Sequence, residues 1–584
     1  MKRYLSKLLS EVLGSMFDNG QISALPSFNF DIPRENFGDY STNVAMIIAR
    51  EGKFQPNDVA DIIARGMQEL DKAGKNIIEE VKVVSGFVNI YLSKQAIAEN
   101  VLNLTEEVKI DQFGVSKKVV FEYSSPNTNK PLHIGHTRND VFGMACINLL
   151  RATGHSVVSC EVINDRGIHI MKSMLMYSKY GNGETPESAV LKPDHFIGKY
   201  YQMFASENAK FEALKKTELE QTSLEKEAQD LLQKWEAGDE QVRELWQKMN
   251  DWYYQGVKQT YKREGSEFDS VEHESDMYDK GRDLVLEGVK KGVFHKDETG
   301  AVYVDLTEQG LDKKYLLRKD GTTIYITQDM YLWYLRDQKY HPDAAIVVTA
   351  AEQIYHFAVL KKIFELLEFP WAQSFQHLPY GFVFLGKNKI SSREGKSVSA
   401  DELLEITKER VAETMRNSLK IKGSADDDVL LETVAFGAIK YGYLKFDPNT
   451  QIYFDLEETV AIEGNTGPYL QYTYARIKSI LSKAGDVVRE APLGLSEKTE
   501  LALARHLMHY DEAVVKAARD FRPTAVCSYL FELASKFNSF YDQVSVLQAE
   551  TEKQKQQRLV LLLSVANVLQ HGLALLGIKT VEQM

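Results

Sequence analysis

The chain has 584 residues, of which 44% are hydrophobic and 26% charged, and a formal net charge of −13 at pH 7. This length suits about three or four globular domains, and the composition excludes a disordered or fibrous protein. The acidic balance argues against a surface coated with nucleic-acid-binding charge, although a local basic patch can still contact phosphates.

The first predicted element is an amphipathic helix near the N-terminus. Polar residues interrupt its apolar positions, unlike the continuous apolar segment of a signal peptide. The apolar residues at helical spacing are Leu5, Leu8, Leu9, Val12, Leu13 and Met16. Runs at 81–84 and 87–92 follow and are typical of strands. Residues 1–112 are therefore predicted to form an N-terminal α/β domain.

Two histidines, His133 and His136, form the most informative pattern. They follow a strand-like run and a turn at 117–127 and open a helix-like stretch. A helix N-terminus placed after a strand can receive phosphate through free backbone N–H groups, and residues three apart share a helix face. Gly135 would let a flat base approach the backbone. The pattern favours nucleotide activation, although four residues alone leave open an exposed histidine pair on an ordinary helix.

Strand-like and helix-like segments then alternate up to about residue 385. Buried-strand candidates lie at 157–163 and 344–348, and such alternation predicts a doubly wound parallel sheet with ligands at the carboxyl ends of its strands. We expect a Rossmann-like catalytic domain at 113–385. A helical insertion at about 175–300 is dense in Glu, Lys, Gln and Leu, without a sustained heptad.

A small, polar and cationic segment follows the next strand-like run. It contains Lys389, Ser391, Ser392, Arg393 and Lys396. A mobile cationic loop can stabilise charge that develops on a transferring group, whereas such a loop on its own is more often a solvated turn. Residues 386–455 are predicted to hold this loop and a region that contacts the stem of a nucleic acid.

The last part of the chain, 456–584, is predicted to be an all-helical bundle. Tyr469, Tyr474 and Arg476 place aromatic and basic side chains on one segment. These side chains could stack on unpaired bases, or the tyrosines could be core residues. Three widely spaced cysteines, and no run of eighteen apolar residues, predict a reducing, cytoplasmic compartment, no zinc site and no membrane helix.

In this order, His-Ile-Gly-His and Lys-Ile-Ser-Ser-Arg resemble the HIGH and KMSKS signatures of class I aminoacyl-tRNA synthetases. The first is matched in full, and the second has Ser392 where a second Lys is usual. The surrounding residues resemble the arginyl-tRNA synthetase family over essentially the whole chain. The segments that carry the likeness are 37–43, 122–127, Lys130-Pro131, Arg138, 164–167, 320–322, 325–329, 352–357 and 464–472.

This resemblance implies how arginine is held. A guanidinium is a planar fork of donors, best met by carboxylates. Glu122, Tyr325 and Asp329 would hold it, while Asn127 and Gln353 would hold the α-amino and carboxylate end. The alternative is that Glu122 and Asp329 pair with structural Arg or Lys residues.

The resemblance also implies the reaction and its partners. ATP with Mg²⁺ would activate L-arginine to arginyl-adenylate, and the arginyl group would pass to the 3′-terminal ribose of tRNA(Arg). The expected ATP-binding and catalytic residues are His133, Gly135, His136, Lys389, Ser391, Ser392 and Arg393, and His133 would also touch arginine. Lys130 or Lys396 could replace the missing second Lys. No tightly bound cofactor is expected.

In the family the N-terminal domain contacts the tRNA elbow and the C-terminal residues approach the anticodon loop. Tyr469, Tyr474, Arg476 and Met584 are therefore expected to bind tRNA, and the enzyme is expected to be a monomer. Two other interpretations stay open: a class I synthetase for another amino acid, and a synthetase-like RNA-binding protein without catalysis.

Overall fold

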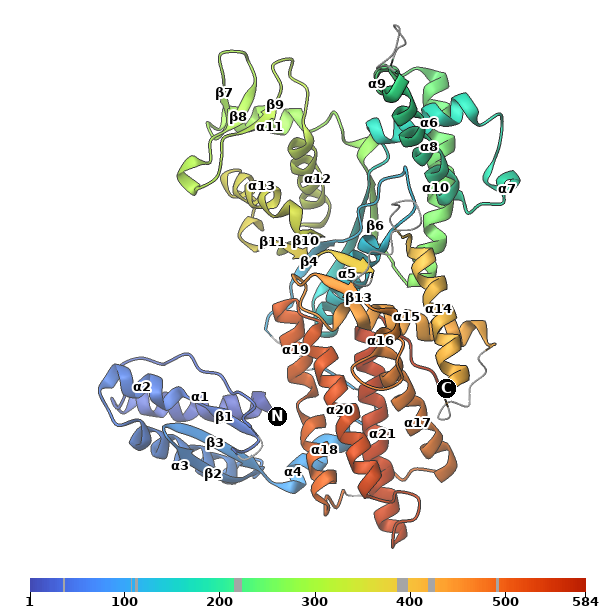
Figure 1. Ribbon diagram of the computed structural model, residues 1–584. Helices are drawn as coiled ribbons and strands as arrows, with labels where there is room; N and C mark the ends of the chain where they lie inside the picture. The colour runs from blue at the N-terminus through green and yellow to red at the C-terminus, as the bar shows by residue number, and fades with distance from the viewer. Residues whose placement is uncertain are drawn as a thin grey trace.

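The computed structural model describes residues 1–34, 37–106, 108–110, 114–214, 223–385, 398–418, 426–489 and 493–584. Three units follow one another along the chain: an N-terminal α/β unit, a central unit built on a parallel sheet, and a C-terminal helical bundle (Figure 1). The predicted multidomain α/β architecture is confirmed.

The N-terminal unit packs helices against a three-stranded antiparallel sheet of order β1-β3-β2. Its elements are α1 (Lys2–Asp18), β1 (Tyr40–Thr42), α2 (Val44–Gly52), α3 (Pro56–Ala73), β2 (Ile78–Val84) and β3 (Phe87–Leu92). All six apolar residues predicted for the face of the first helix are buried in α1. Helix α4 (Lys94–Asn103) leads out of this unit and packs on the helical bundle (Figure 1).

The central unit is organised by a five-stranded parallel sheet. Its order is β11 (Phe375–Tyr380), β10 (Ala344–Ala350), β4 (Lys118–Glu122), β5 (Ser156–Ile163) and β6 (Ser270–His273). Alternate residues of β4 face opposite sides: Val119 and Phe121 join the core beneath α5 (Ile134–Ala152), while Val120 joins the core beneath α12 (Tyr325–Tyr340) and α13 (Ile354–Leu366). The predicted doubly wound sheet is confirmed.

Two excursions leave this sheet, one on either side of β6. The first is helical and has an aromatic-rich core of its own; it contains α6 (Ile168–Tyr180), α7 (Pro186–Ala189), α8 (Pro193–Leu214), α9 (Leu224–Glu236) and α10 (Glu240–Glu264). The second contains η1 (Glu274–Asp276), α11 (Arg282–Lys290), η2 (Thr307–Gln309) and a small sheet of β7 (His295–Lys296), β8 (Val302–Val304) and β9 (Lys314–Leu317). The span predicted as one insertion, about 175–300, therefore includes a core strand that is too short to stand out in the sequence.

Two 3-10 turns, η3 (Ala351–Gln353) and η4 (Ala372–Ser374), flank α13 between β10 and β11. The elements that lead from the sheet to the bundle are β12 (Val383–Leu385), α14 (Ala400–Asn417), α15 (Asp428–Leu444), β13 (Ile452–Phe454) and α16 (Leu456–Thr459). Strands β12 and β13 pair in parallel. Buried Arg138 of α5 ties this pair to the central unit, since it donates to the carbonyls of Gly381 at 2.6 Å and Pro448 at 2.8 Å.

The C-terminal bundle consists of α17 (Gly467–Ala484), α18 (Lys498–Met508), α19 (Tyr510–Asp520), α20 (Thr524–Gln543) and α21 (Glu552–Leu575). Among the described residues, only α21 is long and apolar enough to cross a membrane, and 67% of its apolar window is buried inside the protein. It contacts α17, α18 and α20, so α21 is the core helix of the bundle.

Candidate active site

The histidine pair lies where strand β4 gives way to helix α5. His133 is the N-cap of α5 and His136 is the third residue of the helix. Each imidazole accepts a backbone N–H at its Nδ1: His133 from Gly135 and His136 from His133, both at 3.1 Å. The two rings lie 3.9 Å apart between centroids. The sequence therefore builds a capping box from two histidines in place of the usual Ser and Glu.

This arrangement corrects the expected mode of phosphate binding. The N–H groups of the first turn already have partners: Ile134 donates to the carbonyl of Val398, and His136 and Thr137 donate to that of His133. They are therefore not free for an anion. Since Nδ1 of each ring accepts, the ring proton of a neutral imidazole lies on Nε2. The Nε2–H groups are the donors left for phosphate.

Burial and a nearby cation keep the histidines neutral. Burial lowers the pKa of His133 to about 4, and the ammonium of Lys130 adds to this effect. Burial, His133 and Lys130 hold the pKa of His136 well below its usual value. Lys130 is half-buried, which lowers its own pKa. No hydrogen bond or ion pair to the Lys130 ammonium is found among the described residues, so it is available to a ligand.

Gly135 leaves room for the ring of His133. A Cβ at this position would lie 3.0 Å from Cε1 and 3.2 Å from Nδ1 of the His133 ring. The glycine therefore makes room for the neighbouring imidazole, which needs that space to accept the Gly135 N–H. The approach of a base to this backbone stays a prediction.

The residues expected to bind arginine lie near one another on β4 and α12. Glu122 ends β4 and faces α12, while Tyr325 and Asp329 stand one turn apart at the start of α12. Asp329 and Glu122 are the charges that most raise the pKa of Tyr325, together with burial. His356 of α13 contacts both Asp329 and Tyr325: its Nε2–H donates to Asp329 Oδ2 at 2.6 Å, and its ring lies 4.9 Å from that of Tyr325.

Glu122 already has a structural partner. Its Oε2 accepts from Nη1 of Arg336 at 2.5 Å, and Nη2 of Arg336 reaches Glu272 at 3.0 Å. The sequence left open that Glu122 pairs with a structural Arg or Lys residue, and the structure shows this ion pair with Arg336. Burial raises the pKa of Glu122, and Arg336 opposes part of that rise. Oε1 of Glu122 keeps only a long contact, 3.4 Å, with the Ser125 hydroxyl.

Two expected ligands sit at the rim of the same edge. Asn127 is exposed and pairs through its backbone with Asn164, so the turn after β4 continues alongside the end of β5. Gln353 is half-buried and is the residue that precedes α13. Both therefore follow strand ends of the parallel sheet, which is where such a fold binds ligands.

The second signature lies outside the described residues, so Lys389, Ser391, Ser392, Arg393 and Lys396 have no placement here. The residues just after it are held against the histidine turn. Ser399 bridges to His133, and the N–H of Ala400 donates to the carbonyl of Leu132 at 2.8 Å. The chain thus returns to the first signature directly after the second.

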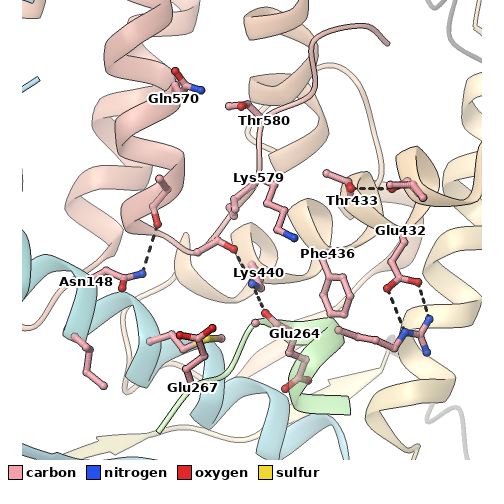
Figure 2. Close-up of a pocket in the computed structure, with 18 of the residues that line it drawn as sticks. Asn148, Glu264, Glu267, Glu432, Thr433, Phe436, Lys440, Gln570, Lys579 and Thr580 are labelled. Atoms are coloured by element: carbon pink, nitrogen blue, oxygen red, sulfur yellow. Dashed lines mark hydrogen bonds and ion pairs between the residues drawn. The ribbon is translucent and has the colours of Figure 1, made fainter. Parts of the chain in front are cut away.

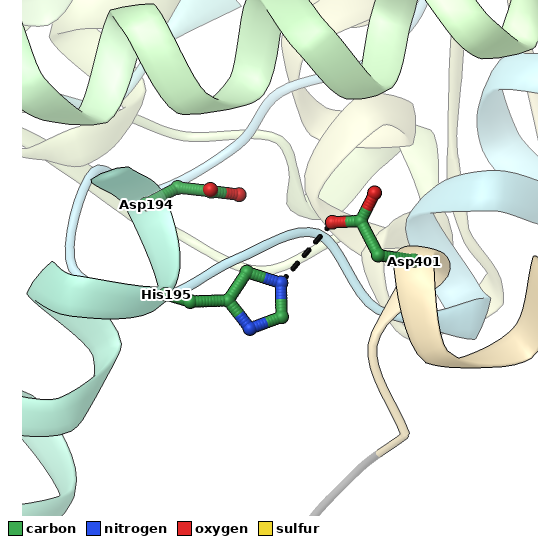
Figure 3. A group of neighbouring side chains, drawn as sticks. All are labelled: Asp194, His195 and Asp401. Carbon is green, nitrogen blue, oxygen red and sulfur yellow. Dashed lines mark hydrogen bonds and ion pairs between the residues drawn. The ribbon is translucent and has the colours of Figure 1, made fainter. Parts of the chain in front are cut away.

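A group that could hold a metal by geometry alone stands beyond this turn. Asp194, His195 and Asp401 bring ligand atoms together (Figure 3). The ammonium of Lys192, however, lies 3.1 Å from Asp194 and 2.7 Å from Asp401. The two carboxylates therefore share the ammonium of Lys192, and the group anchors the start of α14 to the helical excursion.

A cavity lies between the central unit and the C-terminal bundle. It measures about 910 Å³ and is lined by α5, α15, the end of α10 and the C-terminal tail (Figure 2). Lys440 lines this cavity and donates to the carbonyls of Glu264 and Gly577, both at 2.6 Å. None of the residues predicted to bind ATP or arginine lines this cavity.

The residues expected to bind tRNA are mostly packed inside the bundle. Tyr474 is 2% exposed and donates to Glu582, and Met584 is 8% exposed. Stacking of Tyr474 on a base is therefore not supported, because its ring is core, as the alternative interpretation had it. Tyr469 and Arg476 are half-buried and share Asn538 as a hydrogen-bond partner.

Sequence reasoning missed several charged residues at this edge. Arg336, Glu272 and Glu274 were not singled out, and no role was assigned to Arg166. Burial raises the pKa of Glu274 to about 7, against the effect of Arg166. Arg166 packs over the Tyr278 ring at 4.3 Å and pairs with Glu236 at 2.5 Å. The partners come from distant segments, so no local pattern could have identified them.

Family models match three consecutive stretches of the chain. A model described as the catalytic domain of class I (R) tRNA synthetases matches residues 99–456, and a DALR anticodon binding domain matches 470–584. Residues 3–92 match an arginyl tRNA synthetase N-terminal domain. With the parallel sheet and the histidine pair at its carboxyl edge, these matches define a class I aminoacyl-tRNA synthetase.

Curated relatives identify the member of that class. The arginine–tRNA ligase of Bacteroides thetaiotaomicron is 40% identical over 573 residues, 94% of each chain. That of Flavobacterium psychrophilum is 41% identical over 538 residues, 88% of this chain and 89% of the relative. The chain belongs to the arginyl-tRNA synthetase family of arginine–tRNA ligases, as its signatures predicted.

Solved structures agree with this assignment. An arginyl-tRNA synthetase of Thermus thermophilus matches with a TM-score of 0.84, 25% identity and full coverage of both chains. One from Plasmodium falciparum matches with a TM-score of 0.81 at 20% identity and covers 100% of this chain, a likeness of fold. The arrangement of all three units is thus a known one.

Proposed function

We propose that the chain joins L-arginine to tRNA(Arg) in two steps at the carboxyl edge of the parallel sheet. The observation that carries the proposal is the placement, on one edge, of a neutral histidine pair and a group of carboxylates. The first suits the phosphates of ATP and the second suits a guanidinium. The expected surroundings are cytoplasmic, and the expected working state is a monomer.

In the first step the arginine carboxylate attacks the α-phosphate of Mg²⁺-bound ATP, and pyrophosphate leaves. The Nε2–H groups of His133 and His136 donate to the phosphates as charge moves toward the leaving group. Lys130 supplies a positive charge beside them, in place of the second Lys missing from the second signature. Lys389 and Arg393 bind the pyrophosphate, with Ser391 and Ser392 beside the ATP.

Arginine is held by groups of opposite charge and matching shape. Asp329 and Oε1 of Glu122, the oxygen that Arg336 does not hold, accept from its guanidinium, and Tyr325 covers it. Asn127 and Gln353 bind the α-amino and carboxylate end. A lysine substrate would offer a single ammonium instead of a planar fork and would leave acceptors unpaired, which is the basis of the expected selectivity.

In the second step the 3′-terminal ribose hydroxyl of tRNA attacks the adenylate carbonyl and releases AMP. The N-terminal unit is assigned to the tRNA elbow and the helical bundle to the anticodon loop. Of the bundle residues first considered, Tyr469 and Arg476 retain partial exposure and are the better candidates for RNA contact.

ATP–pyrophosphate exchange with each of the twenty amino acids, with and without total tRNA, tests the proposal. Exchange with arginine alone, and only when tRNA is present, is the expected result. Exchange with another amino acid would overturn the assignment of Glu122, Tyr325 and Asp329. Folded protein that binds tRNA but gives no exchange would instead mean that catalysis has been lost.

A further inference from the structure

A buried arginine stands behind the carboxylates of the arginine site. Arg336 lies on α12 seven residues after Asp329, so the two share a helix face. It is 1% exposed, and the ring of Trp333 packs against its guanidinium at 4.6 Å. An arginine is almost never buried to this extent unless it is paired. Its position therefore demands carboxylate partners.

Those partners come from two strands that are not neighbours. Glu122 belongs to β4 and Glu272 to β6, while β5 lies between them. Cys160 of β5 pairs in register with Glu122 and lies near Arg336, and its buried thiol, whose pKa burial raises to about 12, is uncharged. The guanidinium thus reaches across β5 and holds one carboxylate with each terminal nitrogen, at 2.5 Å and 3.0 Å. A lysine has one charged nitrogen and cannot reproduce this fork.

The negative charges around Glu122 work against its ionisation. Asp329 on α12 and Glu272 on β6 both disfavour a negative charge on it, and burial does so more strongly. Tyr325 on α12 and Cys160 on β5 also face it and carry no positive charge. A carboxyl in such a place becomes protonated unless a cation contacts it, and Arg336 provides that contact.

We infer that Arg336 is a positioning residue for arginine recognition: it keeps the Glu122 carboxylate ionised and fixes Oε2, so that Oε1 is presented to the substrate guanidinium. The inference rests on the proposed role of Glu122 as an arginine ligand. A protonated Glu122 would offer the substrate a neutral, partly donating group, and the charge-assisted bond would be lost.

The variant Arg336→Met tests this directly, since methionine fills similar apolar space without charge. The quantity measured is the ratio of its KM for arginine in aminoacylation to that of the wild type, and we expect this ratio to be about 10 to 100 at pH 7. The ratio should fall toward pH 8.5, because Glu122 then ionises even without the Arg336 guanidinium. The KM for ATP should stay within about twofold.

Two further variants separate the explanations. Arg336→Lys keeps one positive charge, so its KM ratio at pH 7 should lie between those of wild type and Arg336→Met. If Arg336→Met does not fold, Arg336→Lys takes its place in the test. Glu122→Gln should raise the KM for arginine at every pH, and adding Arg336→Met to it should raise the KM little further.

A KM ratio for Arg336→Met that is near one, or raised equally from pH 6.5 to 8.5, would overturn the inference while leaving Glu122 as a ligand. An unchanged KM for arginine in Glu122→Gln would instead show that Glu122 is not an arginine ligand. The proposed role of Arg336 would then be overturned as well. The two failures are therefore distinguishable.

Discussion

His133 and His136 cap the same helix end, and both rings are held by backbone N–H groups: that of His133 donates to the His136 ring, and that of Gly135 donates to the His133 ring. The N–H of His133 donates to Nδ1 of His136 at 3.1 Å, and the two rings lie 3.9 Å apart. Neither ring can turn without breaking a cap, so both Nε2–H groups have settled directions before a nucleotide arrives. Donors fixed in advance cost no reorganisation during the reaction.

The first prediction concerns pH. With the pKa of His133 at about 4 and that of His136 held well below its usual value by burial, both rings are neutral at the pH near 6.5 where a free imidazole titrates. The kcat/KM for ATP reports groups of the free enzyme, so it should show no histidine inflection near 6.5. The profile of wild type divided by that of His133→Asn, in ATP–pyrophosphate exchange, should be flat from pH 6 to 8. A slope in that ratio would show that protonated His133 takes part.

The second prediction concerns Gly135. In Gly135→Ala the new Cβ would press on the His133 ring, whose Cε1 would be 3.0 Å away. Alanine favours helix by about 0.5–1 kcal/mol over glycine, and this gain offsets the close contact with the ring. The melting temperature should therefore hardly change, while the rate of ATP–pyrophosphate exchange falls about tenfold or more. Gly14→Ala, with open space around its Cβ, is the matched control. Unchanged exchange in Gly135→Ala would mean that the ring position is not critical.

The third prediction concerns Lys130. Its ammonium lies near both histidines and influences their charge. Loss of one charge-assisted contact to phosphate costs about 1.5–3 kcal/mol, so Lys130→Ala should slow adenylate formation about 10- to 100-fold. Lys130→Arg keeps the charge and should retain most of the rate. If single-turnover adenylate formation is equally fast in Lys130→Ala, another residue replaces the missing signature lysine.

The fourth prediction concerns Asp329. A neutral amide at this position would leave the substrate guanidinium short of one charged acceptor, a loss of about 2–5 kcal/mol for a buried pair. Asp329→Asn should therefore raise the KM for arginine at least about 30-fold. Asp312→Asn, which also removes a carboxylate that accepts from an aromatic side chain but lies on the exposed second excursion, should leave that KM unchanged. Equal effects of both changes would point to general destabilisation.

Much of the fold follows from local patterns in the sequence. The apolar runs at 157–163 and 344–348 are core strands because parallel sheets are covered on both faces and need apolar residues throughout. The helical spacing of Leu5 and Leu9 likewise predicted the buried face of α1. β6 escaped notice because four residues ending in Glu and His carry little apolar signal.

The site was less open to prediction. Glu122 and Arg336 are 214 residues apart, and only the crossing of α12 over β4 and β5 joins them. The Ile134 N–H at the start of α5 has a partner because the chain returns at Val398, which no local rule foretells. Tyr474 was placed among RNA-binding candidates on residue type, whereas packing of α17 against α21 decides its burial.

Helix α21 also constrains when the molecule can finish folding. Its Ser564 donates to the carbonyl of Val101 and its Asn567 to that of Leu104, so the last helix completes contacts with the segment that leaves the N-terminal unit. Domains form in order as a chain is made, whereas the two partners of each of these bonds lie 463 residues apart. The segment that leaves the N-terminal unit must therefore wait for α21 to be synthesised before these contacts can form.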